Sequence, residues 1–451
     1  MSAATYDLVV IGTGSGGAPA AFRCAADGWS VAIVDERPYG GTCALRGCDP
    51  KKVLIGGAQL ADWHRRMQGH GVRGDLQIDW PALMNFKRSF TEPVPEDREE
   101  RFHKKGIDTF HGTARFIAED AIEIDGETLR FEHLLLANGA KPTPLPIDGA
   151  EHLTTSTEFL ALDQFPERVT FVGGGYISFE FAHLATRVGA EVTILHRGPR
   201  PLEGFEPDLV DVLLERTREL GVTVRLNAEV TAVEKRDGTV TVRANRDGET
   251  LATEADLAVH GAGRVPALDT ANLEAGEVEA TKRGVVVNEY LQSTSNPRVY
   301  AAGDAAATNG LPLTPVGAME SLTVASNLRK GNERTPNYDG IPTVVFTIPP
   351  LASVGWTEAE ARSQGLDVSV KHTPDITGWY SYERLRAEAA GFKVLIDEDT
   401  DRLLGAHMLG EHAEEVISLF AMALRHGLTA SALRHGIYAY PTHASDLPHM
   451  L

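Results

Sequence analysis

Residues 6–17 have the sequence YDLVVIGTGSGG, an apolar run that leads directly into a glycine-rich turn. Such a run is typical of a parallel strand that is covered on both faces. Gly12 suits a tight turn, Gly14 lets the backbone approach a pyrophosphate, and Gly17 lets a helix pack closely on the strand. The N–H groups at the start of that helix would then face the anion. This stretch therefore predicts a dinucleotide-binding βαβ unit.

The acidic residue that such a unit needs follows the next apolar run, residues 30–34. Asp35 comes directly after that run and lies 23 residues after Gly12. A carboxylate at this position is placed to accept a hydrogen bond from a ribose hydroxyl. Glu36 is the alternative candidate. The context of strand, turn, helix, strand and acid favours a bound nucleotide over a glycine-rich turn without a ligand.

A second unit of the same pattern occurs at residues 169–178, VTFVGGGYIS, and is followed by a β-rich run at 191–195. Here His196 and Arg197 stand where the first unit has acidic residues. A guanidinium pairs bidentately with a phosphate, whereas a carboxylate would repel the 2′-phosphate of NADPH. We therefore predict that this second site prefers NADPH. The alternative is that Arg197 is only a solvated surface charge.

Composition excludes several classes of function. The chain has 451 residues, and 63 acidic against 43 basic side chains give a net charge of −20, which argues against binding to nucleic acid or anionic membranes. It has neither a signal-peptide pattern nor an apolar run long enough to span a membrane. Its 3 cysteines are too few for a disulfide scaffold or a four-cysteine zinc site. We expect a cytoplasmic protein.

Two of the cysteines lie close together in residues 40–52, GGTCALRGCDPKK. In a regular helix, residues five apart are about 140° apart around the axis and about 7.5 Å along it, whereas a disulfide needs Cα atoms within about 7 Å. A bond between Cys43 and Cys48 therefore needs a distorted helix start, which Gly47 and Pro50 favour, and would be easily reduced. A helix start and Lys51 would favour a thiolate. Metal binding is the competing interpretation, but it needs further ligands.

Further segments match a known family in its own order. These are residues 12–17, the segment from Gly41 to Lys51, residues 137–139 (ANG), 173–180, 263–266 (GRVP) and 302–304 (AGD), with 345–349 and 354–358 near the end. With them, the chain resembles the FAD-dependent pyridine nucleotide–disulfide oxidoreductases. This family includes glutathione reductase, dihydrolipoamide dehydrogenase and mercuric reductase. The resemblance covers essentially the whole chain, and its cysteine segment is the most specific part.

The resemblance implies an α/β fold with two doubly wound, Rossmann-like nucleotide domains, the second inserted into the first, and an α+β C-terminal dimerisation domain. We predict an FAD-binding domain at residues 1–143 and 268–335, an NAD(P)-binding domain at 144–267 and the dimerisation domain at 336–451. The Pro-rich segment 141–146 is expected to be a linker, and an amphipathic helix is expected at about 413–426. The family forms homodimers in which the partner's C-terminus completes each active site.

The resemblance also implies roles for individual residues. FAD would be bound by Gly12, Gly14, Gly17, Asp35, Glu36, Gly41, Thr42, Ala114, Gly139, Asp304 and Thr314. NADPH would be bound by Gly173, Gly175, Tyr176, Ile177, His196, Arg197 and Gly263, with Tyr176 as an aromatic gate. Cys48 would be the thiolate in charge-transfer contact with the flavin, and Cys43 would exchange with the substrate. Lys51 and Glu180 match a pair near the reactive flavin nitrogen.

The chain departs from the family near its end, where residues 440–446 have the sequence YPTHASD. Most disulfide-reducing members have His-Pro-Thr followed by a Glu that orients the His. Here Tyr440 takes the His position and Ser445 the Glu position. Tyr440 could act as a phenol, His443 could act from a shifted position with Asp446 as its orienter, or the reaction could need no such group. The end of the chain has no cysteine pair, which argues against mercury reduction.

These observations predict a flavoprotein that takes hydride from NADPH and passes two electrons through flavin to the pair Cys43–Cys48 and on to an acceptor. A low-molecular-weight disulfide is the leading acceptor. One alternative is a member without the His–Glu dyad that acts on a quinone, a metal ion or a ketone with carboxylation. Another is a flavin-bearing redox sensor with little turnover. Two intact glycine motifs argue against the sensor, which needs no reductant site.

Overall fold

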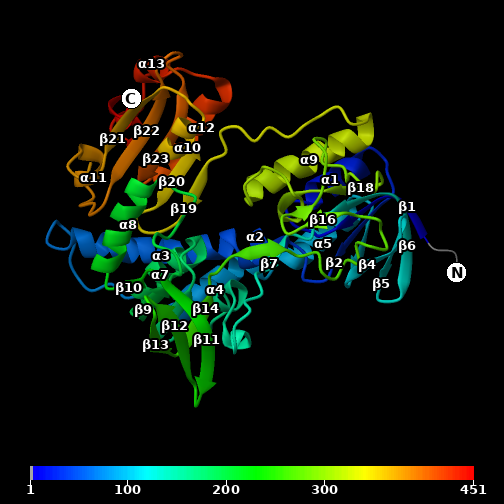
Figure 1. Cartoon of the computed structure of the whole chain (residues 1–451), viewed down its shortest axis with the longest axis horizontal. Helices are drawn as coiled ribbons and strands as arrows, with labels where there is room; N and C mark the ends of the chain where they lie inside the picture. Colours follow the sequence, from blue (N-terminus) through cyan, green and yellow to red (C-terminus); the bar gives the residue numbers. More distant parts are fainter. Residues whose placement is uncertain (1–3) are drawn as a thin grey trace. The chain divides into compact units, whose positions relative to one another are not determined.

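The computed structural model describes residues 4–451, which form two compact units (Figure 1). Unit 1 comprises Met1–Lys51, Phe86–Thr143 and Arg264–Tyr338. Unit 2 comprises Lys52–Asn85, Pro144–Gly263 and Asp339–Leu451. This division does not test the three predicted domains, whose bounds stay a prediction.

Unit 1 is built on a seven-stranded sheet in the order β3-β2-β1-β6-β5-β4, with β18 paired to β6. The strands β1, β2, β3, β6 and β18 pair in parallel, whereas β4 and β5 are antiparallel to their neighbours. The strands are β1 (Ala4–Ile11), β2 (Val31–Asp35), β3 (Ile107–His111), β4 (Ala114–Ala118), β5 (Ala121–Ile124), β6 (Glu127–Leu136) and β18 (Val299–Ala301). Leu8, Val9 and Val10 are fully buried in β1, which explains its unbroken apolar run.

Helix α1 of unit 1 follows β1 and its glycine turn, and η2 follows β18. Helices α1 and α9 lie beside each other (Figure 1), and Ala20 N donates to Ser321 Oγ at 3.0 Å. The helices are α1 (Ala18–Ala26), α2 (Gly41–Arg46), α5 (Val94–Lys104), η2 (Gly303–Ala305) and α9 (Thr314–Lys330), and both α3 (Cys48–Met67) and α4 (Trp80–Thr91) cross a unit boundary. The small strand pairs are β7 (Ala140–Pro142) with β15 (Arg264–Pro266), and β16 (Ala280–Thr281) with β17 (Gly284–Val285). The start of the Pro-rich segment thus forms an edge strand.

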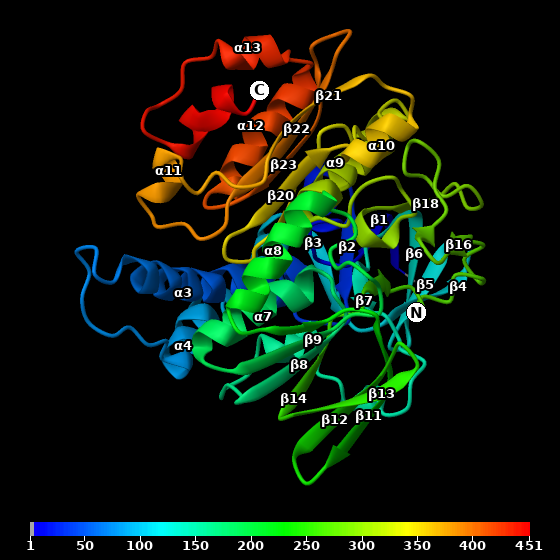
Figure 2. The same cartoon turned by 60° about the vertical axis from the view of Figure 1, so that its left-hand side comes forward.

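Unit 2 contains a parallel four-stranded sheet, β10-β9-β8-β14, next to an antiparallel sheet, β11-β12-β13 (Figure 2). The strands are β8 (Arg168–Val172), β9 (Glu191–Leu195), β10 (Thr223–Arg225), β11 (Ala228–Arg236), β12 (Thr239–Arg246), β13 (Glu249–Ala255) and β14 (Leu257–His260). The helices are η1 (Ala150–His152), α6 (Ser156–Phe159), α7 (Tyr176–Val188) and α8 (Pro207–Glu219). The predicted α/β class with two parallel nucleotide-type sheets is confirmed.

The C-terminal part of unit 2 is a five-stranded antiparallel sheet, β19-β20-β23-β22-β21, with α12 packed against β20 and β23. Its elements are β19 (Thr343–Val345), β20 (Leu351–Gly355), α10 (Glu358–Ser363), β21 (Val368–Thr373), α11 (Tyr380–Glu383), β22 (Gly391–Asp397), β23 (Leu403–Leu409), α12 (Ala413–His426), α13 (Ala430–Arg434) and η3 (His443–His449). The predicted helix at 413–426 is confirmed, with Val416, Phe420 and Ala423 buried. Across residues 4–451, no helix has the length and apolar character needed to cross a membrane.

Candidate functional site

The cysteine pair lies at a break between two helices of unit 1. Helix α2 ends at Arg46, Gly47 has φ −142° and ψ −114°, and α3 begins at Cys48. The predicted distortion at Gly47 is therefore present. Both cysteines are thiols here, Cys43 half-buried and Cys48 exposed. The Sγ of Cys48 lies 3.6 Å from the hydroxyl of Thr314, the first residue of α9.

The two thiols have opposite acidities. A hydrogen bond from Cys43 lowers the pKa of Cys48 to about 6, helped by the Thr314 hydroxyl and the charge of Lys51 against the effect of burial. The same hydrogen bond raises the pKa of Cys43 well above that of an ordinary thiol, because Cys43 is the donor, and burial raises it further. At neutral pH the reduced pair is thus one thiolate, at Cys48, held by one thiol, at Cys43.

We expect the reduced protein to react with iodoacetamide at Cys48 with a midpoint near pH 6, since the thiolate is the reacting form. Cys43→Ala removes the hydrogen-bond donor and should move this midpoint toward about 8.5, the value of a free thiol. The measurement is the alkylation rate against pH, with the modified residue identified by mass spectrometry. Cys24→Ala is the matched control, because Cys24 is fully buried and should leave the midpoint unchanged. A wild-type midpoint near 8.5 would contradict this assignment.

Glycines of three predicted segments meet in one cradle in unit 1. A Cβ added to Gly41 would lie 2.4 Å from Gly14 Cα, and one added to Gly12 would lie 2.2 Å from the carbonyl oxygen of Ala137. A Cβ at Gly303 would lie 3.8 Å from Gly16 Cα. The turn at 12–17 is therefore held against the start of α2 and against η2, as the close packing of backbone around a nucleotide requires.

Asp35 braces this turn from the end of β2. Its Oδ2 accepts from the backbone N–H of Thr13 at 2.9 Å and from its hydroxyl at 2.7 Å, and its Oδ1 accepts from Arg37 N at 3.0 Å. A carboxylate has about four acceptor positions, so Oδ1 can still receive a ribose hydroxyl. Glu36 accepts from the Thr113 hydroxyl at 3.3 Å, next to Ala114 at the start of β4. Thr13 was not among the predicted site residues, although it lies inside the glycine motif.

Asp304 offers a second carboxylate to the same region. Burial raises the pKa of Asp304, and the charge of Arg264 opposes that shift. Its turn is held by the buried Glu320 of α9, which accepts from Gly303 N at 2.6 Å and from the hydroxyls of Thr308 and Tyr338. Glu320 was not among the residues predicted from the sequence. The one feature that could have indicated it is a carboxylate on the buried side of a helix.

The residues of unit 1 fit a flavin dinucleotide. The Nε of Arg46 and the Oδ1 of Asn138 are buried without a hydrogen-bond partner in the described chain. Gly139, at φ +69°, faces open space, and Asn138 precedes it. Glycine turns without side chains, unpaired polar atoms and a buried carboxylate are the features that a polar, extended cofactor satisfies.

The second glycine turn belongs to unit 2. A Cβ at Gly173 would lie 2.4 Å from the Gly261 carbonyl oxygen, next to Gly263, and one at Gly261 would overlap the Ser178 hydroxyl. Gly175 caps α7, which Tyr176 and Ile177 begin. The ring of His196 packs on Gly174, and its Nε2 lies 2.9 Å from the Arg200 carbonyl oxygen. Ser178, the small residue in the third position of the motif, thus lets α7 pack closely against the backbone at Gly261, as the motif predicted.

Glu180, predicted near the reactive flavin nitrogen, lies on α7, and Arg197, predicted at the 2′-phosphate of NADPH, lies just after β9. Glu180 is buried, and its Oε1 accepts from Phe346 N at 2.8 Å. Arg197 is exposed, whereas Arg200 is paired with Asp211 at 3.2 Å. Lys51 belongs to unit 1 and Glu180 to unit 2, so their predicted pairing stays a prediction.

The C-terminal candidates differ from each other in exposure. Tyr440 is 81% exposed, whereas His443 is buried against the rings of Tyr382 and His412. Burial lowers the pKa of His443 to about 4, and the nearby His412 adds to this. Its Nε2 and the Oδ2 of Asp446 are each buried without a hydrogen-bond partner within residues 4–451. His443 is therefore uncharged at neutral pH, and its catalytic role stays a prediction.

Ser445, at the position of the family's Glu, has a local structural role. Its N–H donates to the Thr442 hydroxyl at 3.2 Å, and its hydroxyl accepts from Thr442 N at 3.3 Å. This reciprocal pair is a capping box that starts η3. Serine is thus explained by the local fold of the segment.

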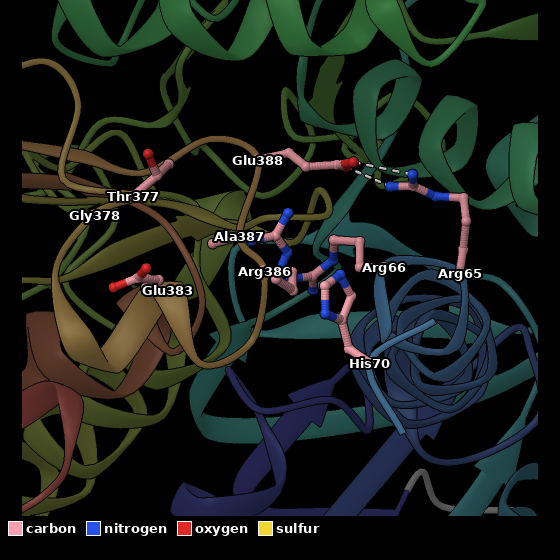
Figure 3. A pocket seen from close by; sticks show the side chains of 9 residues that line it. All are labelled: Arg65, Arg66, His70, Thr377, Gly378, Glu383, Arg386, Ala387 and Glu388. Carbon is pink, nitrogen blue, oxygen red and sulfur yellow. Dashed lines mark hydrogen bonds and ion pairs between the residues drawn. The ribbon is translucent and has the colours of Figure 1, made fainter. Parts of the chain in front are cut away.

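A separate hollow of about 360 Å³ lies within unit 2 (Figure 3). It is lined by Arg65, Arg66, His70, Thr377, Gly378, Glu383, Arg386, Ala387 and Glu388. Arg65 pairs with Glu388 (Nη1 to Oε1, 3.0 Å), and the buried Arg66 pairs with Asp62 at 2.8 Å and with Glu411. Most of its positive charge is compensated within the protein, so we assign no ligand to it. Elsewhere among residues 4–451, no group of three or more His, Cys, Asp or Glu side chains is arranged to hold a metal ion.

Comparison with known proteins gives two family matches that together span nearly the whole chain. Residues 6–327 match the family described as pyridine nucleotide-disulphide oxidoreductase. Residues 341–451 match the dimerisation domain of the same family. The matches include both glycine motifs and the cysteine segment.

Individual relatives agree with this result. The chain is 31% identical to a glutathione reductase from Burkholderia cepacia, over 98% of this chain and 97% of the relative. It is 32% identical to a dihydrolipoyl dehydrogenase from Haloferax volcanii, over 97% of this chain and 94% of the relative. Among solved structures, the Cu(II) complex of the HOCl-induced flavoprotein disulfide reductase RclA from Escherichia coli aligns with a TM-score of 0.88 and 28% identity, covering 100% of this chain and 99% of that one.

Proposed function

The chain belongs to the pyridine nucleotide–disulfide oxidoreductases, and from that premise we propose that it transfers electrons from NADPH through FAD to the pair Cys43–Cys48 and on to a low-molecular-weight disulfide. As a family member it is a flavoprotein oxidoreductase with a redox-active disulfide and a nicotinamide cofactor. The observation that supports the proposal most directly is the position of Cys43 and Cys48 on either side of the helix break at Gly47, with the Sγ of Cys48 at 3.6 Å from the Thr314 hydroxyl, and the lowered pKa of Cys48 agrees with it.

The division of labour within the pair is the one that the family resemblance implies, and the low pKa of Cys48 supports the flavin-side role of that residue. Cys48, as the stable thiolate beside the α9 N-terminus, is suited to remain next to the flavin, and Cys43 is suited to exchange with the acceptor. Transfer of the Cys43 proton to the Cys48 thiolate would give a Cys43 thiolate, which would attack the acceptor disulfide, form a mixed disulfide and release the first thiolate. Attack by the Cys48 thiolate on Cys43 would then release the second thiol and re-form the Cys43–Cys48 bond. The proton that Cys48 took from Cys43 leaves with the first thiol, which restores the Cys48 thiolate for its attack, and the second leaving thiolate takes its proton from a donor of the site or from water.

FAD would be held in unit 1 by the glycine cradle, with Asp35 toward a ribose, Asp304 toward the hydroxyls of the ribityl chain and Thr314 at the flavin. When bound, it would supply the two-electron chemistry that joins nicotinamide oxidation to disulfide reduction. The nicotinamide nucleotide would be held in unit 2 by the turn at 173–178 and by Arg197. Tyr440 and His443 remain proposals for the proton donor.

The matched dimerisation domain supports a homodimer. Leu419 and Met422 of α12 are exposed to 38% and 55%, and Ile437 is fully exposed near Tyr440. Apolar side chains on a surface are typical of a protein interface. We propose that this surface contacts the partner subunit and that the C-terminal segment completes the partner's active site. We also propose a cytoplasmic location, where reducing conditions keep such a pair active.

Anaerobic titration with NADPH tests the proposal. One equivalent should reduce the Cys43–Cys48 bond, and two new thiols per chain should react with a thiol reagent. An acceptor screen with glutathione disulfide and lipoamide should then re-oxidise the pair. Turnover with neither disulfide would contradict the leading acceptor class. Failure of NADPH and NADH to release any thiol would contradict the electron path itself.

A metal ion is the second candidate acceptor, favoured by the solved E. coli flavoprotein with bound Cu(II) and by the replacement of the family's His by the exposed Tyr440. Oxidation of the two thiols to a disulfide would release two electrons, which reduce two Cu(II) ions to Cu(I). Metal reduction requires no proton transfer to a leaving thiol. Cu(II) therefore belongs in the acceptor screen, and turnover with Cu(II) but with no disulfide would favour this candidate.

Arg197→Ala should lower kcat/KM for NADPH by about 10- to 100-fold and leave that for NADH within about twofold. A guanidinium–phosphate hydrogen-bond pair contributes about 1.5–3 kcal/mol, and only NADPH has the 2′-phosphate. Steady-state kinetics with both nucleotides measure the effect. Arg236→Ala, another exposed arginine of unit 2, is the control. Equal losses for the two nucleotides would contradict the assigned preference.

A further inference from the structure

The side chain of Arg46 has an unusual environment in unit 1. It lies on α2 between the two cysteines and is half-buried. Its Nε is buried and has no hydrogen-bond partner in the described part of the chain. An arginine has five N–H donors, and leaving one of them buried and unpaired is unfavourable, because it loses its hydrogen bonds to water without replacement. A partner outside the protein chain would remove this cost.

The acidic groups nearest to Arg46 are already engaged. Asp35 accepts from Thr13 and from Arg37 N, and Glu36 is occupied by Thr113 at 3.3 Å and by Arg37 at 3.7 Å. The other charged neighbours of Arg46 are the cations Arg37 and Arg264.

The guanidinium groups of Arg37, Arg46 and Arg264 therefore share one region, in which Arg37 is paired with Glu36 whereas the Nε of Arg46 has no hydrogen-bond partner in the described part of the chain. Burial and this positive surrounding lower the pKa of Arg46. Mutual repulsion between cations is unfavourable until an anion lies among them. The Nε of Arg46 thus lacks an anionic partner of its own.

The position of Arg46 on α2 indicates which anion this is. Thr42 and Arg46 are four residues apart, so they lie on the same face of the helix. Gly41, at the start of α2, is in contact with Gly14 of the first glycine turn. The helix face that carries Thr42 and Arg46 therefore starts next to the glycine turn, where the diphosphate is predicted to bind.

We propose that Arg46 is a positioning residue for FAD and that its guanidinium pairs bidentately with the cofactor's diphosphate. The inference rests on the proposed binding of FAD by unit 1. The planar fork of arginine matches two phosphate oxygens, and the pair would satisfy the buried Nε.

Apoprotein of the wild type, Arg46→Met and Arg46→Lys provides the test. The dissociation constant for FAD, measured by quenching of flavin fluorescence, should rise about 10- to 100-fold for Arg46→Met and less for Arg46→Lys, which keeps the charge but loses the fork. Arg130→Ala is the matched control, because Arg130 is an exposed arginine of unit 1 that pairs with Asp120 at 2.6 Å, and its constant should stay within about twofold. ADP, which has the diphosphate but no flavin, should lose affinity by the same factor as FAD.

Melting temperatures separate this role from a structural one. Arg46→Met should leave the apoprotein as stable as the wild type and should lower the melting temperature only of the FAD-loaded form. Equal losses in both forms would overturn the proposal, as would unchanged affinity for FAD. A loss for FAD without a loss for ADP would move the contact to the flavin half and overturn the diphosphate assignment. If wild-type apoprotein binds no FAD, the proposed function itself fails.

Discussion

Cys48→Ser should abolish disulfide reduction by NADPH, with a fall in turnover of at least about 1,000-fold, as removal of a nucleophile causes in other enzymes. The hydroxyl of serine is not ionised at neutral pH, whereas the pKa of Cys48 is about 6. The variant can neither close the disulfide with Cys43 nor resolve a mixed disulfide. The measurement is the rate of NADPH oxidation with the disulfide acceptor that the screen identifies.

Two further variants make this result specific. Cys24→Ala changes the remaining cysteine, which is fully buried in the core of unit 1, and should retain turnover. Cys43→Ser should also abolish turnover, because it removes the residue that attacks the acceptor. Flavin content and melting temperature should match those of the wild type in both active-site variants. If Cys48→Ser kept more than about a tenth of the wild-type rate with a disulfide, the pair would not lie on the electron path.

Gly41→Ala should yield protein that loses its flavin on gel filtration. The added Cβ would lie 2.4 Å from Gly14 Cα, and Gly41 has φ +73°, which disfavours any side chain. The alanine would push the start of α2 away from the turn at Gly14 and would hold residue 41 at an unfavourable φ. Together these two effects should cost about 3 kcal/mol of folding free energy. If that cost falls on the FAD-bound form, affinity falls by about 100-fold. Fluorescence titration of the apoprotein with FAD measures it.

Gly28→Ala is the matched control for this experiment. Gly28 has φ +88°, so an alanine there has comparable backbone strain, but nothing lies within 4 Å of the added Cβ. This variant should lose about 1–2 kcal/mol of stability and bind FAD as the wild type does. The difference between the two variants therefore isolates the contact between Gly41 and Gly14. Equal FAD affinity in both would mean that the cradle does not position the cofactor.

Much of the fold followed from local patterns. The apolar runs before Gly12 and Gly173 form β1 and β8, and the amphipathic stretch at 413–426 forms α12. These patterns succeed because strand, turn and helix each depend on neighbours within a few residues. The prediction was less accurate at the end of the first nucleotide-binding segment. The linker predicted at 141–146 begins within strand β7, whose partner β15 lies more than 100 residues later in the chain. Pairing of that kind has no local signal.

Within the site, the sequence predicted which residues take part. It did not predict the burial and the hydrogen bonds that set their pKa values. The cysteine spacing predicted a distorted helix, and the break at Gly47 is present. The pKa of Cys48 is lowered most by the hydrogen bond from Cys43, and further by Thr314, which is 266 residues away. Likewise, His443 looked like a replacement base in the sequence, whereas its burial against Tyr382 and His412 lowers its pKa to about 4.

By itself, the sequence determined the family, the α/β architecture and the location of the redox pair, because glycine spacing, apolar periodicity and cysteine spacing express short-range geometric needs. Only the tertiary structure decided that Asp35 braces its own glycine turn through Thr13, that His443 is buried and uncharged at neutral pH and that the Nε of Arg46 is left without a partner. Each of these depends on desolvation and on contacts between segments far apart in the chain. Such interactions exist only once the core has closed and water has been excluded from it.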